Sequence, residues 1–356
     1  MKAIIDNKIP FIQGQIEKLV DEANYLPGSA ITASDVRDAD ILVVRTRTKC
    51  NRQLLEGSTV KFIVTATIGY DHIDTDYCRQ AGIRWTNCPG CNASSVCQYV
   101  TNAIALLGIK SEGTTIGIVG VGHVGSLIAR AAVKAGFNVL MSDPPQEEGG
   151  ITAADIIDTA AADNLGNSHV CRFASLAEIC SSADIITFHT PLTHSGKYPT
   201  YHLADTNFFS RLTPGTVIIN ASRGGVVDES ALKKALADGT VAHAVIDTWE
   251  GEPRIDPELL TSAAIATPHV AGYSANGKRN ATLMSLGAVR QFLLDTTKPA
   301  TPLYNKYAEA TFDIPLPSAP YLTPQTLADD SRRLKENIDG FEDFRGNYPR
   351  RIEYEE

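Results

Sequence analysis

TIGIVGVGHVGSLIARAAVKA, residues 115–135, is the stretch that decides the fold of this chain. The apolar run Thr115–Val119 is typical of a buried strand, and helical spacing begins after the pattern GxGxxG. In such a strand–turn–helix unit Gly120 permits the tight turn, Gly122 lets a pyrophosphate approach the backbone, and Gly125 lets helix and strand pack closely. The stretch predicts a dinucleotide-binding turn in a parallel α/β sheet. The alternative is a glycine-rich turn with a structural role alone.

A carboxylate at the end of the next predicted strand indicates which dinucleotide binds. Asn138–Ser142 is followed by Asp143, which lies about 20 residues beyond the first glycine of the pattern, as a ribose-binding carboxylate requires. An aspartate there accepts hydrogen bonds from the ribose and repels a 2′-phosphate, and Pro144–Glu148 adds no Arg or Lys. The sequence therefore predicts NAD. We expect His123 and Val124, at the start of the following helix, to present N–H groups to its phosphates.

Length and composition indicate a globular protein of about two domains. The chain has 356 residues, 43% of them hydrophobic, and a formal net charge of −9, so no basic surplus favours nucleic acid or an anionic membrane. No apolar run approaches the about 18 residues of a membrane span, and the first residues lack a signal-peptide pattern. Seven cysteines, an odd number, favour reduced thiols and a cytoplasmic location. Cys88-Pro-Gly-Cys91 has no second pair, so we expect no metal ion.

Strand-like runs alternate with helical spacing throughout, which predicts an α/β protein with two doubly wound parallel sheets. In the first 92 residues we expect strands at Lys2–Asp6, Ile41–Arg45, Lys61–Thr65 and Ile83–Thr86, and helices at Phe11–Ala23 and Asp74–Ala81. In the second block we expect six strands at Thr115–Val119, Asn138–Ser142, Ile185–Phe188, Thr216–Asn220, Val241–Asp247 and Ala264–Thr267.

Two long helical patterns mark the expected domain boundaries. One begins at Asn92, and the other follows Gly272. We therefore expect residues 1–92 and 273–295 to form one domain, and residues 93–272 to form the Rossmann domain that binds NAD.

The remainder of the chain carries two less regular stretches. Residues 296–356 begin with six prolines between positions 299 and 324, which predicts an extended linker, followed by a charged C-terminal segment. Pro144–Ser168 is rich in Gly, Ala and Asp, which predicts an elaborated surface loop.

Three polar residues follow the last three predicted strands of the Rossmann domain, where open α/β sheets bind ligands. His269 can take a hydroxyl proton near neutral pH, and Glu252 can orient its imidazole. Arg223 can bind a carboxylate through two parallel hydrogen bonds. Each residue alone is more often structural, but together they favour oxidation of a 2-hydroxy acid.

At these residues the sequence resembles the D-isomer-specific 2-hydroxyacid dehydrogenases. The stretches that carry the resemblance are GIVGVGHVG (117–125), NASRGGVVD (220–228), DTWEGEP (247–253) and TPHVAG (267–272). Further stretches resemble the branch of that family that oxidises 4-phospho-D-erythronate in pyridoxal phosphate biosynthesis: VRTRTKCN (44–51), TATIGYDHID (65–74), PGCNA (89–93), DPP (143–145), FHTPL (188–192) and HVAGY (269–273).

The resemblance implies a role for each matched residue. It implies that Arg223 and Glu252 are catalytic and that His269 is the proton donor or acceptor. It implies contacts with NAD at Asp143, Thr190, Ala221, Ser222, Arg223, Asp247 and Gly272. It implies substrate contacts at Thr46, Thr67, Gly69 and Tyr273.

The resemblance also implies an arrangement of domains and subunits. Residues 1–92 and 273–295 would be a flavodoxin-like, substrate-binding lid domain, and the chain would be a homodimer. The C-terminal segment is shorter than the dimerisation domain of that branch, and the helix that begins at Asn92 offers a second two-fold interface.

The basic residues around Thr46 suggest a phosphate on the substrate. Arg45, Arg47 and Lys49 place three cations within five residues, which could hold a phosphate or form a basic surface edge. The alternatives to 4-phosphoerythronate are other acids, such as 3-phosphoglycerate or glycerate. A third alternative is an NAD-sensing regulatory protein of the same fold.

Overall fold

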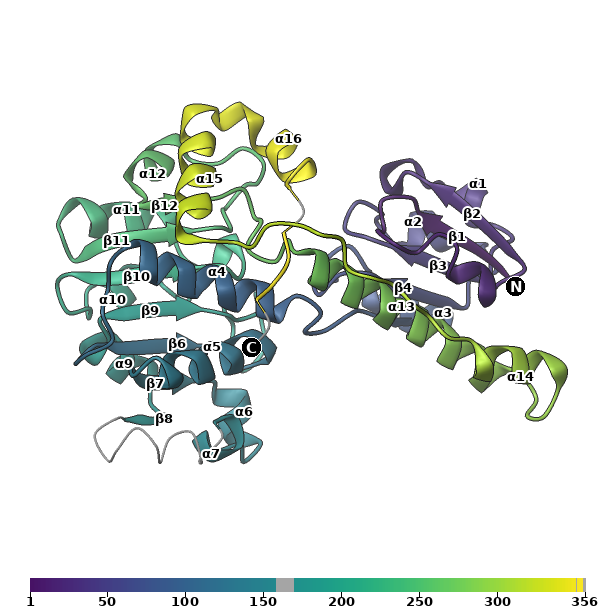
Figure 1. Cartoon of the computed structure of the whole chain (residues 1–356), viewed down its shortest axis with the longest axis horizontal. Helices are drawn as coiled ribbons and strands as arrows, with labels where there is room; N and C mark the ends of the chain where they lie inside the picture. The colour runs from purple at the N-terminus through teal and green to yellow at the C-terminus, as the bar shows by residue number, and fades with distance from the viewer. Residues whose placement is uncertain (158–169, 350, 355–356) are drawn as a thin grey trace. The chain divides into compact units, whose positions relative to one another are not determined.

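The computed structural model describes residues 1–157, 170–349 and 351–354, and the chain divides into two compact units (Figure 1). Unit 1 comprises Met1–Asn92 and Ser274–Ser318, and unit 2 comprises Ala93–Tyr273 and Ala319–Glu356. Each unit is a parallel sheet covered by helices, so the predicted α/β class with two doubly wound parallel sheets is confirmed. No helix in the described ranges is long and apolar enough to cross a membrane.

Unit 1 has a five-stranded parallel sheet in the order β2-β1-β3-β4-β5. Its strands are β1 (Lys2–Asp6), β2 (Glu22–Leu26), β3 (Ile41–Val44), β4 (Phe62–Thr65) and β5 (Arg84–Thr86). Its helices are α1 (Ala33–Val36), α2 (Arg52–Leu55), α3 (Thr75–Ala81), α13 (Ala275–Thr296) and α14 (Pro302–Glu309). Both faces of this sheet are buried, because successive strand residues point to opposite faces. On one face Ile5 and Val43 pack with residues of α13, and on the other Ile4 and Leu42 pack with residues of α1 to α3.

The helix predicted at Phe11–Ala23 is wrong. The residues there form a short 3-10 helix, Ile16–Lys18, and then the edge strand β2. Phe11 and Gly14 have positive φ values of 64° and 81°, which no α-helix tolerates. The apolar spacing reflects burial of the side chains in the core of unit 1, not a continuous helix.

Unit 2 has a seven-stranded parallel sheet in the order β12-β11-β10-β9-β6-β7-β8. Its strands are β6 (Thr115–Val119), β7 (Asn138–Ser142), β8 (Cys171–Phe173), β9 (Ile185–Phe188), β10 (Thr216–Asn220), β11 (Val241–Ile246) and β12 (Ile265–Ala266). Its helices are α4 (Ala93–Leu106), α5 (His123–Lys134), α6 (Pro144–Glu148), α7 (Ala153–Ile156), α9 (Leu176–Ser182), α10 (Thr206–Phe209), α11 (Glu229–Ala237), α12 (Pro257–Ser262), α15 (Pro324–Glu336) and α16 (Phe341–Gly346). The six predicted strands are present, and the seventh, β8, has only three residues and was not predicted.

The stretch Pro144–Ser168 begins with two short helices, α6 and α7, where a loop was predicted. Asp143 and Thr152 cap these helices with their side chains, and both prolines of α6 lie in its first turn, where a missing N–H has no effect. The rest of that stretch, residues 158–169, lies outside the described residues.

The proline-rich region is not extended throughout, as the sequence predicted. Pro302 and Pro324 each begin a helix, α14 and α15, behind capping residues Thr301 and Thr323. Proline is well suited to the first helical position because its φ angle is already helical. Residues 296–356 are shared between the units, and the part from Ala319 onward packs on unit 2.

The C-terminal part of unit 2 covers α4, the helix expected to offer a two-fold interface. Leu322 and Leu327 join the same buried cluster as Val96 and Val100 of α4. Within α4, which the structure describes in full, Thr101 and Ala105 are the exposed residues. The C-terminal part of the chain therefore packs on one side of α4, and the two-fold interface at this helix stays a prediction.

Candidate active site

The glycine-rich turn joins β6 to α5 where the strand order of unit 2 changes direction. β6 pairs with β7 on one side and with β9 on the other. Gly120 has a φ of +89°, and a Cβ there would lie 2.8 Å from the carbonyl carbon of His189, just after β9. A Cβ at Gly125 would overlap the carbonyl oxygen of Gly120. Both positions therefore require glycine, and the turn lies at the switch point where open α/β sheets bind ligands.

Two features of this turn fit a bound dinucleotide. Gly122 has no protein atom within 4 Å of its would-be Cβ, so space is open in front of its backbone. The Thr190 hydroxyl is buried and has no hydrogen-bond partner among the residues that the structure describes. A polar group of a ligand would satisfy it, because a buried hydroxyl without a partner is unfavourable. His123 and Val124 begin α5 directly after Gly122, with the unpaired N–H groups of a helix start.

Asp143 lies where a carboxylate favours NAD over NADP, and its side chain also stabilises the glycine-rich turn. Its Oδ2 accepts the N–H of Val121 at 2.7 Å, and its Oδ1 accepts the N–H of Gln146 at 3.1 Å. Each carboxylate oxygen can accept a second hydrogen bond. The side chain can therefore hold the turn and still accept from a ribose hydroxyl.

His269 and Glu252 form a hydrogen-bonded pair at the carboxyl edge of the same sheet. His269 Nδ1 lies 2.9 Å from Oε2 and 3.0 Å from Oε1 of Glu252. Burial raises the pKa of the Glu252 carboxyl. The hydrogen bond and charge of His269, the N–H of Trp249 and the charge of Arg345 outweigh that rise and lower the pKa below its usual range. Glu252 is therefore an ionised partner for the imidazole near neutral pH.

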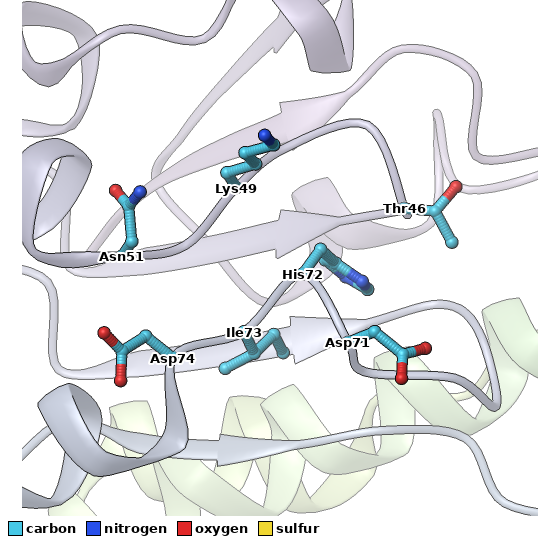
Figure 2. A pocket seen from close by; sticks show the side chains of 7 residues that line it. All are labelled: Thr46, Lys49, Asn51, Asp71, His72, Ile73 and Asp74. Carbon is cyan, nitrogen blue, oxygen red and sulfur yellow. The ribbon is translucent and has the colours of Figure 1, made fainter. Parts of the chain in front are cut away.

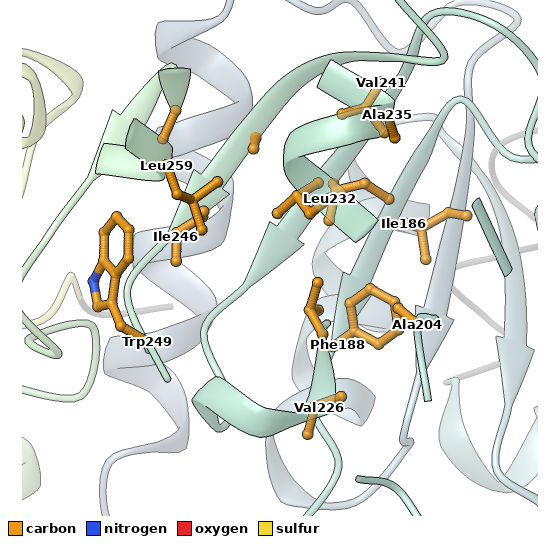
Figure 3. Packing of buried hydrophobic residues seen from close by; sticks show 14 of the residues in the cluster. Ile186, Phe188, Ala204, Val226, Leu232, Ala235, Val241, Ile246, Trp249 and Leu259 are labelled. Atoms are coloured by element: carbon orange, nitrogen blue, oxygen red, sulfur yellow. The ribbon is translucent and has the colours of Figure 1, made fainter. Parts of the chain in front are cut away.

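Trp249 connects the loops that carry the candidate catalytic residues. Its backbone N–H donates to Glu252 Oε1 at 3.0 Å, and its indole Nε1–H donates to the carbonyl of Thr267 at 2.9 Å. A Cβ at Gly224, next to Arg223, would overlap the carbonyl of Trp249. Figure 3 shows the buried indole near Ile246 of β11. The loops after β10, β11 and β12 are thus packed against one residue.

Asp247 shapes the loop on which His269 lies. Its carboxylate accepts the Thr267 hydroxyl at 2.6 Å and the N–H groups of Val270 and Ala271 at 2.7 and 2.9 Å. Burial raises the pKa of Asp247, and the charge of His269 and these three donors oppose the rise. The side chain is 1% exposed. Its geometry is that of a residue that positions the loop, and the predicted contact with NAD remains a prediction.

The loop after β10 places Arg223 beside the same edge. Asn220 accepts the N–H and the hydroxyl of Ser222 at 3.2 and 2.9 Å, and its amide donates to the carbonyl of Arg223 at 2.9 Å. Arg223 donates from Nη1 to the carbonyl of Ser222 at 2.8 Å. Ala221 lies at the start of this loop, directly after β10.

All candidate catalytic and cofactor residues therefore belong to unit 2. Thr190 follows β9, His269 and Gly272 follow β12, and the others follow β6, β7, β10 and β11. The parallel strands bring these positions to one edge of one sheet, as the sequence predicted.

The candidate substrate residues other than Tyr273 belong to unit 1. Arg45 and Thr46 follow β3, and Thr67 and Gly69 follow the neighbouring strand β4. The Thr67 hydroxyl donates to the carbonyl of Gly69 at 2.8 Å. Arg45 donates to the carbonyl of Lys8 at 3.2 Å and is half-buried.

A cavity of about 510 Å³ lies at this edge of unit 1 (Figure 2). The segment after β3 supplies Thr46, Lys49 and Asn51, and the segment after β4 supplies Asp71, His72, Ile73 and Asp74. Figure 2 shows Lys49 on the opposite side of the cavity from the segment that carries Asp71 and Asp74. Lys49 therefore shares its cavity with two carboxylates, whose negative charge disfavours a phosphate there.

The sequence comparisons decide the family. A model of the D-isomer specific 2-hydroxyacid dehydrogenase, NAD binding domain matches residues 94–271. A curated relative from Bacteroides thetaiotaomicron, named erythronate-4-phosphate dehydrogenase, is 48% identical over 99% of this chain and 97% of its own length. The chain belongs to the D-isomer-specific 2-hydroxyacid dehydrogenase family. Its resemblance to that family, predicted from the motifs, is confirmed.

Other relatives of this dehydrogenase agree. The erythronate-4-phosphate dehydrogenase of Pseudomonas putida is 37% identical over 100% of the chain and 93% of its own length. Among solved structures, D-lactate dehydrogenase from Aquifex aeolicus, complexed with NAD and lactic acid, has a TM-score of 0.68 and 23% identity, covering 82% of this chain and 95% of that chain. The latter shows the fold. The chain is an NAD-dependent oxidoreductase with an NAD-binding Rossmann domain.

The sequence of this dehydrogenase did not predict a role in the site for two residues, Trp249 and Arg345. Trp249 lies three residues before Glu252 in the same motif, but an indole takes no part in proton transfer, so the residue type alone indicates no role. Arg345 lies 3.6 Å from Glu252 but follows it by almost a hundred residues, so no local pattern connects the two.

Proposed function

We propose that this dehydrogenase oxidises 4-phospho-D-erythronate to 3-hydroxy-2-oxo-4-phosphonooxybutanoate, in pyridoxal phosphate biosynthesis. The names of its relatives support this substrate. The observation that carries the chemistry is the His269–Glu252 pair, whose members follow strands of the sheet that bears the glycine-rich turn. An acid–base pair beside a dinucleotide turn is what oxidation of a secondary alcohol requires.

The reaction removes one proton and one hydride from the substrate. NAD, when bound, would supply the acceptor for the hydride that leaves C2. His269 accepts the proton of the C2 hydroxyl at Nε2, because Glu252 engages its Nδ1. The ionised Glu252 stabilises the imidazolium that forms. Arg223 binds the substrate carboxylate and polarises the reacting oxygen.

The residues that hold NAD are those around the turn and the adjoining loops. We assign phosphate contacts to Gly120, Gly122, His123, Val124 and Gly125, and the ribose contact to Asp143. The remaining contacts are assigned to Thr190, Ala221, Ser222, Arg223, Asp247 and Gly272. The buried Thr190 hydroxyl and the open space at Gly122 support this assignment.

Unit 1 is proposed as the substrate-binding lid. Thr46, Thr67 and Gly69, with Tyr273 of unit 2, contact the substrate, and Arg45 binds its phosphate. A homodimer in the cytoplasm completes the proposal. The chain has seven cysteines, an odd number, which supports a reducing compartment.

A panel of acids tests the substrate. Purified protein is assayed with 4-phosphoerythronate, 3-phosphoglycerate, D-glycerate and D-lactate, each with NAD and also with an added 2-oxo acid that can reoxidise a retained cofactor. The proposal expects selective oxidation of 4-phosphoerythronate. Preference for another acid would keep the dehydrogenase and reject the substrate, and NAD binding with no turnover on any acid would favour a regulatory protein.

A further inference from the structure

The C-terminal segment of unit 2 packs against β12, the outermost strand of the sheet, and His269 lies in the loop after that strand. Helix α15 lies beside β12 and α4 (Figure 1). Ser331 of α15 accepts the backbone N–H of Ala266 in β12 at 2.9 Å, so it satisfies a donor at the sheet edge. Leu327 and Leu334 are buried on either side of Ser331, each 1% exposed. This segment is therefore an integral part of the Rossmann unit.

The turn into α16 is held by a second buried contact. Asp330 accepts the Tyr348 hydroxyl at 2.7 Å and Arg351 Nη2 at 2.6 Å, and all three side chains are buried. Phe341 and Phe344 of α16 belong to the core cluster that includes Trp249. These anchors lie on both sides of position 345 and fix the helix that carries Arg345.

Arg345 meets the catalytic carboxylate. Its Nη1 lies 3.6 Å from Glu252 Oε2, the oxygen that lies 2.9 Å from His269 Nδ1. The side chains of Arg345 and Glu252 are 21% and 18% exposed, so water screens this ion pair only partly. The contact is close enough to orient the carboxylate and too long for a strong hydrogen bond.

We propose that Arg345 is a positioning residue for the proton transfer: it holds Glu252 in the orientation that presents both oxygens to His269. The C-terminal segment is thereby part of the catalytic site. The inference rests on the proposed roles of His269 and Glu252. Arg345 acts through Glu252 and touches neither the reacting atoms nor the base.

The charges around the imidazole determine how loss of Arg345 alters the pH dependence. Glu252 and Asp247 are the carboxylates that act on His269, and Arg345 is the cation that faces Glu252. Both carboxylates favour the imidazolium, and Arg345 opposes it. Removal of Arg345 therefore makes the site more negative, and the acidic limb of the pH–rate profile should move to higher pH.

The test compares Arg345→Met, Arg345→Lys and Arg333→Met in the full chain. Methionine removes the charge, lysine keeps it, and Arg333 is the matched control because it stacks on Phe344 of the same segment at 4.1 Å. Each variant is checked for folding by its Tm. The readouts are kcat and kcat/KM for oxidation against pH, and an NMR titration of His269 without cofactor, assigned with His269→Ala.

For Arg345→Met we expect kcat to fall by about tenfold and the acidic limb of kcat/KM to shift up by about half a pH unit or more. Arg345→Lys should restore most of kcat and most of the wild-type pH profile, and Arg333→Met should match the wild type in both. A raised KM with unchanged kcat, pH profile and His269 titration would overturn the inference and point to substrate binding. If Glu252→Gln also leaves kcat unchanged, the proposed function fails; if only Arg345→Met does so, the inference alone fails.

Discussion

The imidazole Nδ1 of His269 faces both carboxylate oxygens of Glu252, so the other ring nitrogen, Nε2, is the one left to exchange a proton with the substrate. An ionised carboxylate accepts hydrogen bonds only, and the proton of the neutral imidazole therefore resides on Nδ1. The pair fixes both the tautomer and the ring orientation before any substrate binds. This is the same logic that makes a carboxylate–histidine pair an effective general base.

Replacement Glu252→Gln tests the charge of that carboxylate. The amide oxygen still accepts from Nδ1, but the stabilisation of the imidazolium is lost, so we expect kcat to fall by about 10²-fold. The acidic limb of kcat/KM should move to lower pH, because the negative charge that favours the imidazolium is lost. An acidic limb that moves to higher pH, opposite to this sign, would contradict the pairing.

Substitutions at two glycines of the turn test NAD binding and protein stability separately. Gly122→Ala adds a methyl group to open space, so we expect an unchanged Tm and an NAD affinity lower by about tenfold. Gly125→Ala places a methyl group on the carbonyl of Gly120 and should destabilise the protein by roughly 1–3 kcal/mol. Calorimetric NAD titration and thermal unfolding measure both variants. Equal NAD affinity for Gly122→Ala and wild type would argue against a pyrophosphate at this turn.

Arg45→Ala tests the phosphate site in unit 1. A guanidinium that binds phosphate contributes little to an acid without one, so KM for 4-phosphoerythronate should rise by about 10-fold or more while KM for unphosphorylated erythronate changes little. Arg52→Ala is the control, because Arg52 is exposed in the same unit and pairs with Glu56 at 3.0 Å. Equal increases in KM for the two acids would reject the assignment.

Glu229 makes the stability of the protein depend on pH. Burial raises the pKa of its carboxyl to about 7, although it accepts the N–H of Glu250 at 2.7 Å. The unfolded chain ionises this group at a lower pH, so the folded state loses stability as the pH rises from about 4.5 through 7. Glu229→Gln should therefore be more stable than wild type by about 1–2 kcal/mol at pH 8 and similar at pH 4.

Urea unfolding at the two pH values measures this difference, with Glu56→Gln as an exposed control. If the wild type and Glu229→Gln differ by the same amount at pH 4 and pH 8, the buried carboxyl is not the cause.

The sequence predicted the positions of the candidate residues on the sheet of unit 2 better than it predicted the peripheral elements. Strands that are buried on both faces are continuous apolar runs, and each candidate residue of unit 2 lies in the loop or helix start after one of them, so their placement at one edge of the sheet could be predicted. The strand β2 could not, because it lies at the edge of its sheet and buries none of its residues fully, so it is no continuous apolar run. The role of Arg345 could not be predicted either, because its contact with Glu252 depends on tertiary packing between residues about ninety positions apart.

The most direct test of the proposed mechanism is the turnover of His269→Ala at saturating 4-phosphoerythronate and NAD, with Tm and NAD affinity measured on the same preparation. We expect turnover to fall by roughly two to four orders of magnitude, while Tm and NAD affinity stay close to those of the wild type. Turnover near the wild-type rate in that folded, NAD-binding variant would contradict the assignment of His269 as the base.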